Sequence, residues 1–403
     1  MKYILFFNPS HYYGGVSVLF SRLFFYIKND LDHNVKFVDY DDGFLGKQLT
    51  AASKKSLISF PNPTEGDLEY LEKTNDYVVI CSSSSARKVK AYFNRLGLNP
   101  TILIWVFHPF ELSIQFFYRA RKLVKFGGYP ISKLYLNLFF LKKIRLKKFI
   151  KLGLFKNSIF FMDGACVRAT GYFLNMKKEF RGLKTFLPVP VDKRKSKNIK
   201  VKDNNELVFG YLGRIADFKT IPLLNFIKDL SALKNIRVKL LVIGDGSDLH
   251  FVKKKCLELY PNLSVNFLGS LSNEKSCNII GCNVDVLAAM GTAALDGASM
   301  EKPTILLAPC EKNIKEKYKY NWLHKTNDFC LGDYFDSPWY KEDSESLQEL
   351  VNQLSSNFDL ISKKSYLYVH DYHSVGNVAK KVIIESNKSS LKINDIPFKN
   401  IQI

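Results

Sequence analysis

The sequence predicts an α/β protein built from two doubly wound parallel-sheet domains that face each other across a cleft. The 403 residues are too many for one ordinary hydrophobic core and suit two domains of similar size. Short apolar runs that end in glycine or polar turns alternate with helical patterns, as buried parallel strands alternate with helices. A second series of this kind begins at Leu207, after a stretch that contains prolines and lysines.

The first domain is expected over residues 1–192, and its apolar runs are interpreted as strands. They lie at 3–7, 35–38, 77–80, 101–107 and 159–162. The first run leads through Gly14 and Gly15 into an apolar helical pattern over residues 18–27. A helix amino terminus offers free N–H groups and the positive end of the helix dipole, so this turn is a candidate anion site. A glycine turn that binds nothing is the alternative interpretation.

A basic segment over residues 119–156 follows in the same domain. It holds twelve Lys and Arg residues and no Asp or Glu, and so supplies twelve of the net charge of +21. Apolar side chains such as Phe140 are interleaved with these cations, a composition typical of a segment that lies on anionic lipid. We expect two short helices broken near 127–130, without a clean amphipathic stripe, because Lys143 and Ile150 fall on nearly the same face. A solvated basic face, a nucleic-acid patch and a site for a diphosphate-bearing substrate are the alternatives.

A linker is expected over 193–206 and a second domain over 207–372. Its expected strands lie at 207–212, 238–243, 264–268, 284–287 and 304–307, with helical patterns at 220–232, 248–259, 272–281 and 294–300. This alternation predicts a second parallel sheet. A last helix is expected at 374–384 within a final region 373–403, and the polar tail after Ser386 is expected to be loose.

Composition narrows the class of protein. The chain is 46% hydrophobic and 24% charged, which is ordinary for a globular protein and excludes a disordered one. The sequence contains no run of 18 apolar residues, so no transmembrane helix is expected. The apolar run at the amino terminus is too short for a signal peptide. The seven cysteines lack metal-finger spacing and are typical of reduced thiols in the cytosol. A cytoplasmic protein is therefore expected.

Turns at the carboxyl ends of the second-domain strands carry the candidate ligand contacts, because such folds hold ligands at this edge. Gly213, Arg214 and Lys219 follow the first of these strands. Arginine can grip two phosphate oxygens, and lysine supplies a flexible point charge. Gly244 and Gly246 form a tight turn after the next strand, where the backbone can approach a ligand. Cations that are merely solvated on a loop are the alternative.

A turn of small residues leads into the expected helix at 294–300. Gly291, Thr292 and Ala293 offer free N–H groups that could cradle a diphosphate. Asp296 would stand on the first turn of the helix, where a carboxylate can accept both hydroxyls of a ribose. An Asp that only complements the helix dipole is the alternative.

The order of these motifs resembles the donor-binding domain of the GT-B glycosyltransferases, specifically the group 1 (family 4) enzymes. The resemblance covers about 207–375 and rests on strand-Gly-Arg with a following Lys, on strand-Gly-Asp-Gly, and on the acidic, small-residue stretch before Pro303. It implies a GT-B fold with two Rossmann-like domains. On this resemblance Arg214 and Lys219 would bind the diphosphate of a nucleotide sugar, and Asp296 would bind its ribose.

The same resemblance assigns roles to backbone groups in both domains. The N–H groups of residues 291–293 would contact phosphate, and Gly14 and Gly15 would face the donor phosphates from the first domain. The last helix would cross back onto the first domain. One departure concerns the paired glutamates of the family, because Asp296 stands for the second and Ala288 occupies the position of the first. The resemblance implies retention of configuration.

The general base is sought at strand ends of the first domain. His108 and Glu111 follow the expected strand at 101–107, and Asp163 follows the one at 159–162. A histidine or carboxylate at that edge could deprotonate or orient an acceptor hydroxyl. A satisfied loop histidine and capping carboxylates are the alternatives, and His11 and Glu301 rank behind these candidates.

The sequence thus predicts a glycosyltransferase that moves a sugar from a nucleotide-diphosphate donor to a lipid-linked or polysaccharide acceptor, as in lipopolysaccharide or capsule synthesis. It would lie on the inner, anionic face of the cell membrane. No cofactor, no metal site and no nucleic-acid partner are expected, because cations and helix dipoles would neutralise the diphosphate. A nucleotide-sugar epimerase of the same fold and a non-enzymatic polyanion-binding protein are the alternatives.

Overall fold

The protein is described here by a computed structural model. It covers residues 2–397 apart from 13, 51–52, 75, 118–119, 184, 195–205, 235, 261–262, 313–316 and 341–342. The chain divides into two compact units, one of residues 1–190 with 375–403 and one of residues 191–374. Most of the expected linker at 193–206, and Arg119 of the basic segment, lie outside the described residues.

The first unit contains a six-stranded parallel sheet, which confirms the expected doubly wound architecture. Its strand order is β3-β2-β1-β4-β5-β6. The chain therefore begins at a central strand, adds strands towards one edge as far as β3, and then adds strands towards the other edge from β4 onwards. The strands are β1 (Tyr3–Phe7), β2 (Val35–Asp39), β3 (Leu57–Ser59), β4 (Tyr77–Ser82), β5 (Thr101–Val106) and β6 (Ile159–Phe161). Every residue of β4 and β5 is buried, as expected of central parallel strands covered on both faces. The three-residue strand β3 is too short to have been predicted.

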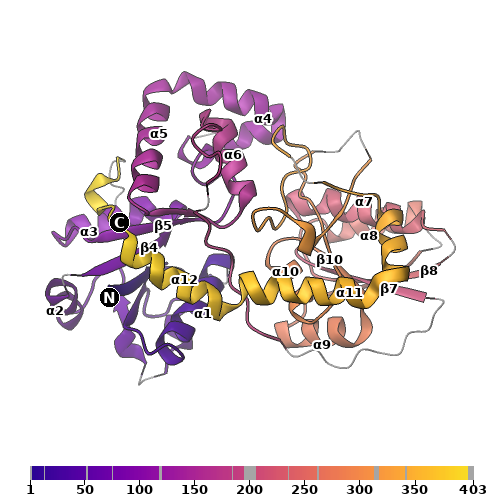
Figure 1. The fold of residues 1–403 in the computed structure, drawn as a ribbon, viewed down its shortest axis with the longest axis horizontal. Coiled ribbons are helices and arrows are strands. Elements are labelled where there is room, and N and C mark those ends of the chain that lie inside the picture. Colours follow the sequence, from indigo (N-terminus) through magenta and orange to yellow (C-terminus); the bar gives the residue numbers. More distant parts are fainter. Residues whose placement is uncertain are drawn as a thin grey trace. The chain divides into compact units, whose positions relative to one another are not determined.

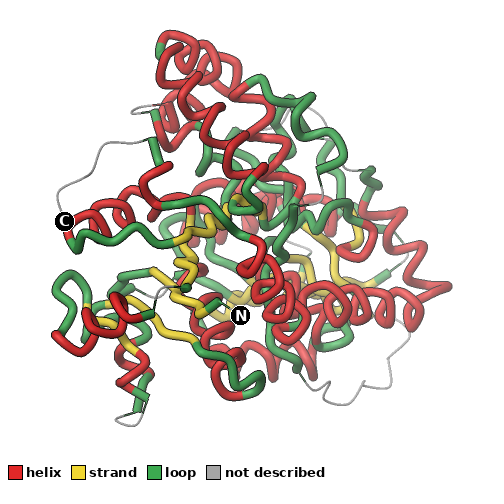
Figure 2. The backbone as a smooth tube through the Cα atoms, turned by 60° about the vertical axis from the view of Figure 1, so that its left-hand side comes forward, coloured by secondary structure: helices red, strands yellow, loops and turns green. Residues whose placement is uncertain are grey.

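Helices cover this sheet, and Figure 2 shows them in red around the yellow strands. They are α1 (Gly15–Asn29), α2 (Glu65–Lys73), α3 (Ala86–Arg95), α4 (Ala120–Leu138), α5 (Phe140–Phe155), α6 (Gly164–Leu174) and α12 (Val375–Lys388). Helix α1 buries Phe20, Leu23, Phe24 and Ile27, which recur at the three- and four-residue spacing of one helix face. Helix α12 packs against α1.

The chain after α12 does not form a loose tail, so that prediction is wrong as far as residue 397. Leu391, Ile393 and Ile396 are fully buried in the first unit, and Lys392 pairs with Thr101 at the start of β5. The prediction failed because these isolated apolar residues stand among polar ones. Their local pattern carries no periodic signal, and only long-range packing shows that they are buried.

The basic segment forms α4 and α5, which meet at a corner in Figure 1. The expected break is confirmed: Gly128 has φ 80° and ψ −179° within α4, a conformation that favours glycine. A second break separates the helices at Phe139. Lys143 and Ile150 are both buried on α5, in agreement with their predicted common face. Among the described residues no helix is long and apolar enough to cross a membrane.

The second unit contains a six-stranded sheet of order β12-β11-β10-β7-β8-β9. Its strands are β7 (Glu206–Leu212), β8 (Arg237–Ile243), β9 (Ser264–Gly269), β10 (Val286–Ala289), β11 (Thr304–Leu306) and β12 (Asn321–Trp322). Five strands are parallel, as predicted, and the short edge strand β12 is antiparallel to β11. Its helices are α7 (Thr220–Ser231), α8 (Leu249–Leu259), α9 (Asn273–Asn283), α10 (Thr292–Ser299) and α11 (Leu347–His373).

The long helix α11 was not predicted. It begins with a capping box, in which the Ser346 side chain accepts from the N–H of Glu349 and the Glu349 carboxylate accepts from the N–H of Ser346. Asn357 interrupts it with φ −139° and ψ 31°, and this kink splits the apolar pattern into two parts. Each part is short and mixed with polar residues, so the sequence does not show one continuous periodic face.

Candidate functional site

The carboxyl edge of the second sheet is held together by backbone contacts that only glycine permits. The N–H of Gly213 donates to the carbonyl of Ile243 at 3.1 Å, which ties the turn after β7 to the end of β8. A Cβ on Gly244 would lie 1.9 Å from the carbonyl oxygen of Gly213, and one on Gly246 would lie 2.3 Å from that of Ile215. The two turns therefore lie against each other at the strand ends, where ligands of doubly wound folds bind.

Two cations stand in the turn after β7. Arg214 is exposed and pairs with Asp217 at 3.4 Å. Lys219 is largely withdrawn from solvent, and burial, followed by the nearby positive charge of Arg214, lowers its pKa. Within the described part of the chain Lys219 has no acidic partner. A desolvated ammonium beside a second cation is unfavourable by itself, and an anion bound between them would relieve both charges.

The small-residue turn is the amino terminus of α10. Gly291, the residue that caps this helix, has φ 66° and supplies no side-chain cap. Its own N–H donates to the carbonyl of Leu331 at 2.8 Å, which fixes the turn. A Cβ at Gly291 would meet nothing within 4 Å, so the space beside this helix end is open. Thr292 and Ala293 follow in the first helical turn, where N–H groups lack helical acceptors.

Asp296 lies on the second turn of α10, and not on the first as predicted, because the helix begins at Thr292. Its carboxylate is engaged by Arg194, a residue that was expected in the linker. Its Oδ1 accepts from the guanidinium of Arg194 at 2.9 Å, and both side chains are about five-sixths buried, with exposed fractions of 15% and 16%. Arg194 also donates to Asn273 at 3.1 Å and contacts Cys277, both on α9. A ribose at Asp296 would therefore share the carboxylate with Arg194. No local sequence pattern indicates this ion pair, because its partners are 102 positions apart.

The position of the first family glutamate is inside the sheet. Ala288 is fully buried on β10, in register with Ile305 of β11 and Tyr211 of β7. A methyl group in this place supplies no charge to a reacting sugar. The acid–base groups must therefore come from elsewhere in the chain.

In the first unit the glycine turn leads directly into α1. Gly14 is the residue before the helix and offers no side-chain cap. A Cβ on Gly15 would meet nothing within 4 Å, and one on Gly14 would meet only the hydroxyl of Ser17 at 3.9 Å. Neither glycine is required by packing within this unit. The first turn of α1 contains no acidic residue, which leaves the positive end of its dipole uncompensated locally.

Asp39, at the end of β2, positions the loop before α1 and was not predicted as a site residue. Its carboxylate is buried and accepts from the N–H groups of Ser10 at 2.8 Å, Tyr40 at 2.9 Å and Leu45 at 3.0 Å. Burial raises its pKa, and these hydrogen bonds oppose the rise. An aspartate at the end of a mostly apolar strand was the available signal.

Glu111 lies at the carboxyl ends of β4 and β5 and is buried. Its Oε2 accepts from the hydroxyl of Ser83 at 2.5 Å and from the N–H of Phe107 at 3.0 Å. Burial raises the pKa of Glu111 to about 7, although both hydrogen bonds favour the charged form. A carboxyl group with this pKa can hold or release a proton near neutral pH.

His108 lies three residues before Glu111. Its Nδ1 accepts from the N–H of Phe110 at 3.2 Å, so a neutral ring carries its proton on Nε2. Burial lowers the pKa of His108 to about 3, and the positive charge of Arg121 adds to this effect. The imidazole is therefore neutral under physiological conditions, and its Nε2–H can donate a hydrogen bond.

The remaining candidates have structural partners. Asp163 is fully buried, and its carboxylate caps α6 by accepting from the N–H of Cys166 at 2.9 Å. His11 stacks on Tyr40 with ring centroids 4.1 Å apart. Glu301 has φ 58° in the turn after α10. Of the described residues, no three His, Cys, Asp or Glu side chains gather closely enough to hold a metal ion.

No protein-family profile and no curated protein matches the sequence, whereas many solved structures match the fold. HepE of Anabaena, in complex with UDP and glucose, is 12% identical, with a TM-score of 0.53 over 95% of this chain and 99% of HepE. The lipopolysaccharide outer core galactosyltransferase WaaB is 13% identical, with a TM-score of 0.57 over 96% and 99%. A variant of S. aureus TarM, in complex with UDP and α-GlcNAc-glycerol, is 12% identical, with a TM-score of 0.53 over 96% and 100%.

These similarities extend over nearly the whole of each chain and both of its units. At such low identity they establish the fold and leave the chemistry to the residues. They confirm the GT-B part of the resemblance inferred from the turns of the second unit: the chain has the GT-B fold, with the two Rossmann-like domains of these structures.

Proposed function

We propose that the protein is a glycosyltransferase that binds a nucleotide-diphosphate sugar at the carboxyl edge of its second sheet. The observation that carries the proposal is Lys219, a desolvated ammonium beside Arg214 with no acidic partner among the described residues. The open amino terminus of α10 adds backbone N–H donors at the same edge. Fixed cations and N–H groups of this kind are what the charge of a diphosphate requires.

In the proposed reaction the bond between the donor sugar and its diphosphate breaks, and negative charge grows on the leaving phosphate oxygen. Arg214 and Lys219 neutralise that charge, together with the N–H groups at the start of α10. These groups need little reorganisation because the glycine turns fix their backbone in advance. The acceptor hydroxyl forms the new glycosidic bond and loses its proton. We assign that proton to the carboxylate form of Glu111, because a pKa of about 7 leaves part of this group ionised and able to accept a proton near neutral pH. His108, which is neutral and carries its proton on Nε2, can orient the acceptor hydroxyl by hydrogen bonding.

The proposed donor is a UDP-sugar. UDP is bound in the structures of HepE and TarM, which share the fold of this chain. The proposed acceptor is a glycan on a lipid or polysaccharide carrier, by analogy with WaaB, a lipopolysaccharide outer core galactosyltransferase. Retention of configuration is part of the proposal and rests on the family resemblance of the turns.

Thermal unfolding in the presence of UDP, a panel of UDP-sugars and matching GDP-sugars tests donor binding. A ligand that binds only the folded state raises the melting temperature by mass action. We expect UDP and at least one UDP-sugar to stabilise the wild type, and Lys219→Ala to abolish this effect. Lys228→Ala, which removes an exposed lysine of α7, is the matched control. Equal stabilisation of wild type and Lys219→Ala would reject the assigned clamp.

We further propose that the corner between α4 and α5 rests on an anionic membrane surface. Apolar side chains are exposed here although most of the surrounding charge is positive: Ile131 (50%), Leu134 (64%), Leu138 (76%), Phe140 (64%) and Leu141 (71%). Lys133, Lys142 and Arg145 accompany them, and residues 120–156 contain no acidic residue. Apolar insertion and attraction to lipid headgroups would then act together.

Vesicle flotation tests this surface. Binding to phosphatidylglycerol vesicles should exceed binding to phosphatidylcholine vesicles and should fall in Leu138→Ser with Leu141→Ser. Leu257→Ser changes a leucine of α8 that is 77% exposed and serves as the control. Binding that ignores both lipid charge and the double substitution would contradict the membrane assignment.

A further inference from the structure

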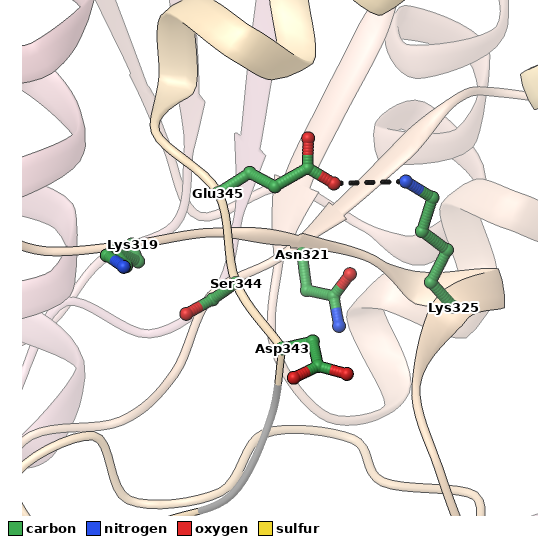
Figure 3. Close-up of a pocket in the computed structure, with 6 residues that line it drawn as sticks. All are labelled: Lys319, Asn321, Lys325, Asp343, Ser344 and Glu345. Carbon is green, nitrogen blue, oxygen red and sulfur yellow. Dashed lines mark hydrogen bonds and ion pairs between the residues drawn. The ribbon is translucent and has the colours of Figure 1, made fainter.

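A polar pocket opens at the antiparallel edge of the second sheet, away from the turns assigned to the donor. It has a volume of about 500 Å³ and is lined by Lys319, Asn321, Lys325, Asp343, Ser344 and Glu345 (Figure 3). Its residues come from β12, from the residues just before and just after this strand, and from the segment that precedes α11. In the sheet, β11 and β10 separate β12 from β7 and β8, which carry the cationic and glycine turns.

Asn321 is the buried polar group of this pocket. The residue is only 7% exposed, but its carboxamide atoms keep access to the solvent in the pocket and have no hydrogen-bond partner among the described residues. Figure 3 shows the side chain in the middle of the pocket, below the ion pair of Lys325 and Glu345. A carboxamide supplies two donor hydrogens and two acceptor lone pairs. This amide is therefore positioned to bind a group that enters the pocket.

The backbone fixes the pocket rigidly. Tyr320 and Glu345 exchange two N–H to carbonyl hydrogen bonds of 2.8 Å, so the segment before α11 is joined to the strand that carries Asn321. The Glu345 carboxylate is held by Lys325 at 3.0 Å. Asp343, Ser344 and Lys319 extend from this frame, and among the described residues Asp343 and Ser344 form no side-chain hydrogen bond or ion pair, whereas Lys319 interacts electrostatically with Glu349.

The charges of the lining select the class of ligand. Lys319 and Lys325 balance Asp343 and Glu345, so the pocket has no net charge to attract a phosphate. The neighbouring amino terminus of α11 offers no anion site either, because its own capping box occupies it. A divalent cation would meet two ammonium groups, and a nucleobase would find no aromatic side chain in the lining. A neutral ligand with many hydroxyl groups matches the mixture of amide, carboxylate, ammonium and hydroxyl.

We propose that this pocket is a second saccharide-binding site that takes a neutral sugar unit. Each sugar hydroxyl can donate to Asp343 or to the amide oxygen of Asn321 and can accept from Lys319 or from the amide nitrogen. The volume lies in the range of small-molecule sites. A glycan bound here would be held independently of the nucleotide. The assignment rests on the pocket alone and stands whether or not the second sheet binds UDP.

Saturation-transfer difference NMR on the full chain tests the proposal. The probes are methyl glycosides of glucose, galactose, mannose and N-acetylglucosamine, with inorganic phosphate as the anionic arm. We expect at least one glycoside to bind with millimolar affinity. Its dissociation constant should rise at least tenfold in Asp343→Ala and in Asn321→Leu, and it should be unchanged in Asp359→Ala, an exposed aspartate of α11.

Two further arms make the result decisive. Ser344→Ala changes a partly exposed side chain, so this variant should fold even if the Asn321→Leu variant does not. Lys219→Ala removes the proposed donor clamp and should leave glycoside binding intact, which separates this site from the donor site. The proposal is overturned if no glycoside binds, if binding survives both Asp343→Ala and Ser344→Ala, or if phosphate displaces the sugar.

Discussion

The two sheets have the same strand order, apart from the antiparallel direction of β12, but their carboxyl edges differ in chemistry. In the second unit this edge carries, beside glycine turns, Arg214, which pairs with Asp217, and Lys219, which has no acidic partner among the described residues. In the first unit it carries Glu111 and His108, buried groups that burial drives toward their uncharged forms. The comparison teaches that one edge is arranged to stabilise a charge brought by a ligand, and the other to keep its ionisable groups neutral.

The largest expected effect concerns the charge-binding edge. Lys219→Ala should lower kcat/KM for transfer from the donor by about 100-fold or more, because removal of a preorganised charge that stabilises a transition state costs about 3–4 kcal/mol. Initial rates with the best UDP-sugar would measure this effect, with Lys228→Ala as control. If the exposed lysine matters as much as Lys219, the contrast between the two edges fails.

The glycine turns should show the next largest effect, on stability. Gly244→Ala places a Cβ 1.9 Å from the carbonyl oxygen of Gly213 at a residue with φ 148°, so the two turns must separate. We expect a loss of about 2–4 kcal/mol in the free energy of unfolding. Gly15→Ala, at the helix start of the other edge, meets nothing within 4 Å and should change stability by less than about 1 kcal/mol. Urea unfolding compares the two, and similar losses would contradict the packing difference.

At the carboxyl edge of the first sheet, His108 should make the stability of the fold depend on acid. The unfolded ring gains a proton below about pH 6.5, whereas the folded ring stays neutral to about pH 3. Lowering the pH through this window therefore favours the unfolded state. His108→Asn keeps an acceptor for the N–H of Phe110 and removes the titration. Its melting temperature relative to wild type should rise between pH 7 and pH 5; a constant difference would show that the imidazole titrates normally.

Glu111 should give the smallest effect, with the opposite sign. The unfolded carboxyl ionises above about pH 4.5, but the folded one keeps its proton to about pH 7, so raising the pH across this window favours unfolding. Glu111→Gln remains able to accept from Ser83 and Phe107. The stability of this variant relative to wild type should increase from pH 5 to pH 7 and then level off. Parallel curves from pH 5 to pH 8 would mean that the carboxyl group is ionised throughout.

Much of the fold could be predicted because the strands are continuous apolar runs. The prediction at 3–7 coincides with β1, and that at 264–268 falls short of β9 by one residue. Both sheets and the alternation of strands and helices followed from such runs. The break at Gly128 was also visible, since two glycines followed closely by Pro130 disfavour a straight helix. By contrast, β12 has only two residues and pairs with β11 across an intervening segment of chain, and no local pattern indicates that pairing.

The backbone turns of the candidate site could be predicted from the sequence, whereas the interaction partners of its side chains could not. Glycines that mark tight turns and cations that follow a strand are local features, and the turns after β7, β8 and β10 were found from them. The pairing of Asp296 with Arg194 and the shelter of Glu111 under Ser83 depend on residues far apart in the sequence. Such contacts decide the protonation and availability of a side chain, and residue type alone does not encode them.

The sequence by itself determined the two α/β units, the glycine turns and the concentration of positive charge in 119–156, because each depends on residue type and short-range order. Only the tertiary structure decided which charges stay unpaired. Burial and the approach of distant segments leave Lys219 without an acidic partner among the described residues, give Glu111 a pKa of about 7, and place the amide of Asn321 in a polar pocket. The physical reason is that desolvation is a property of the packed chain and does not exist in any single segment of it.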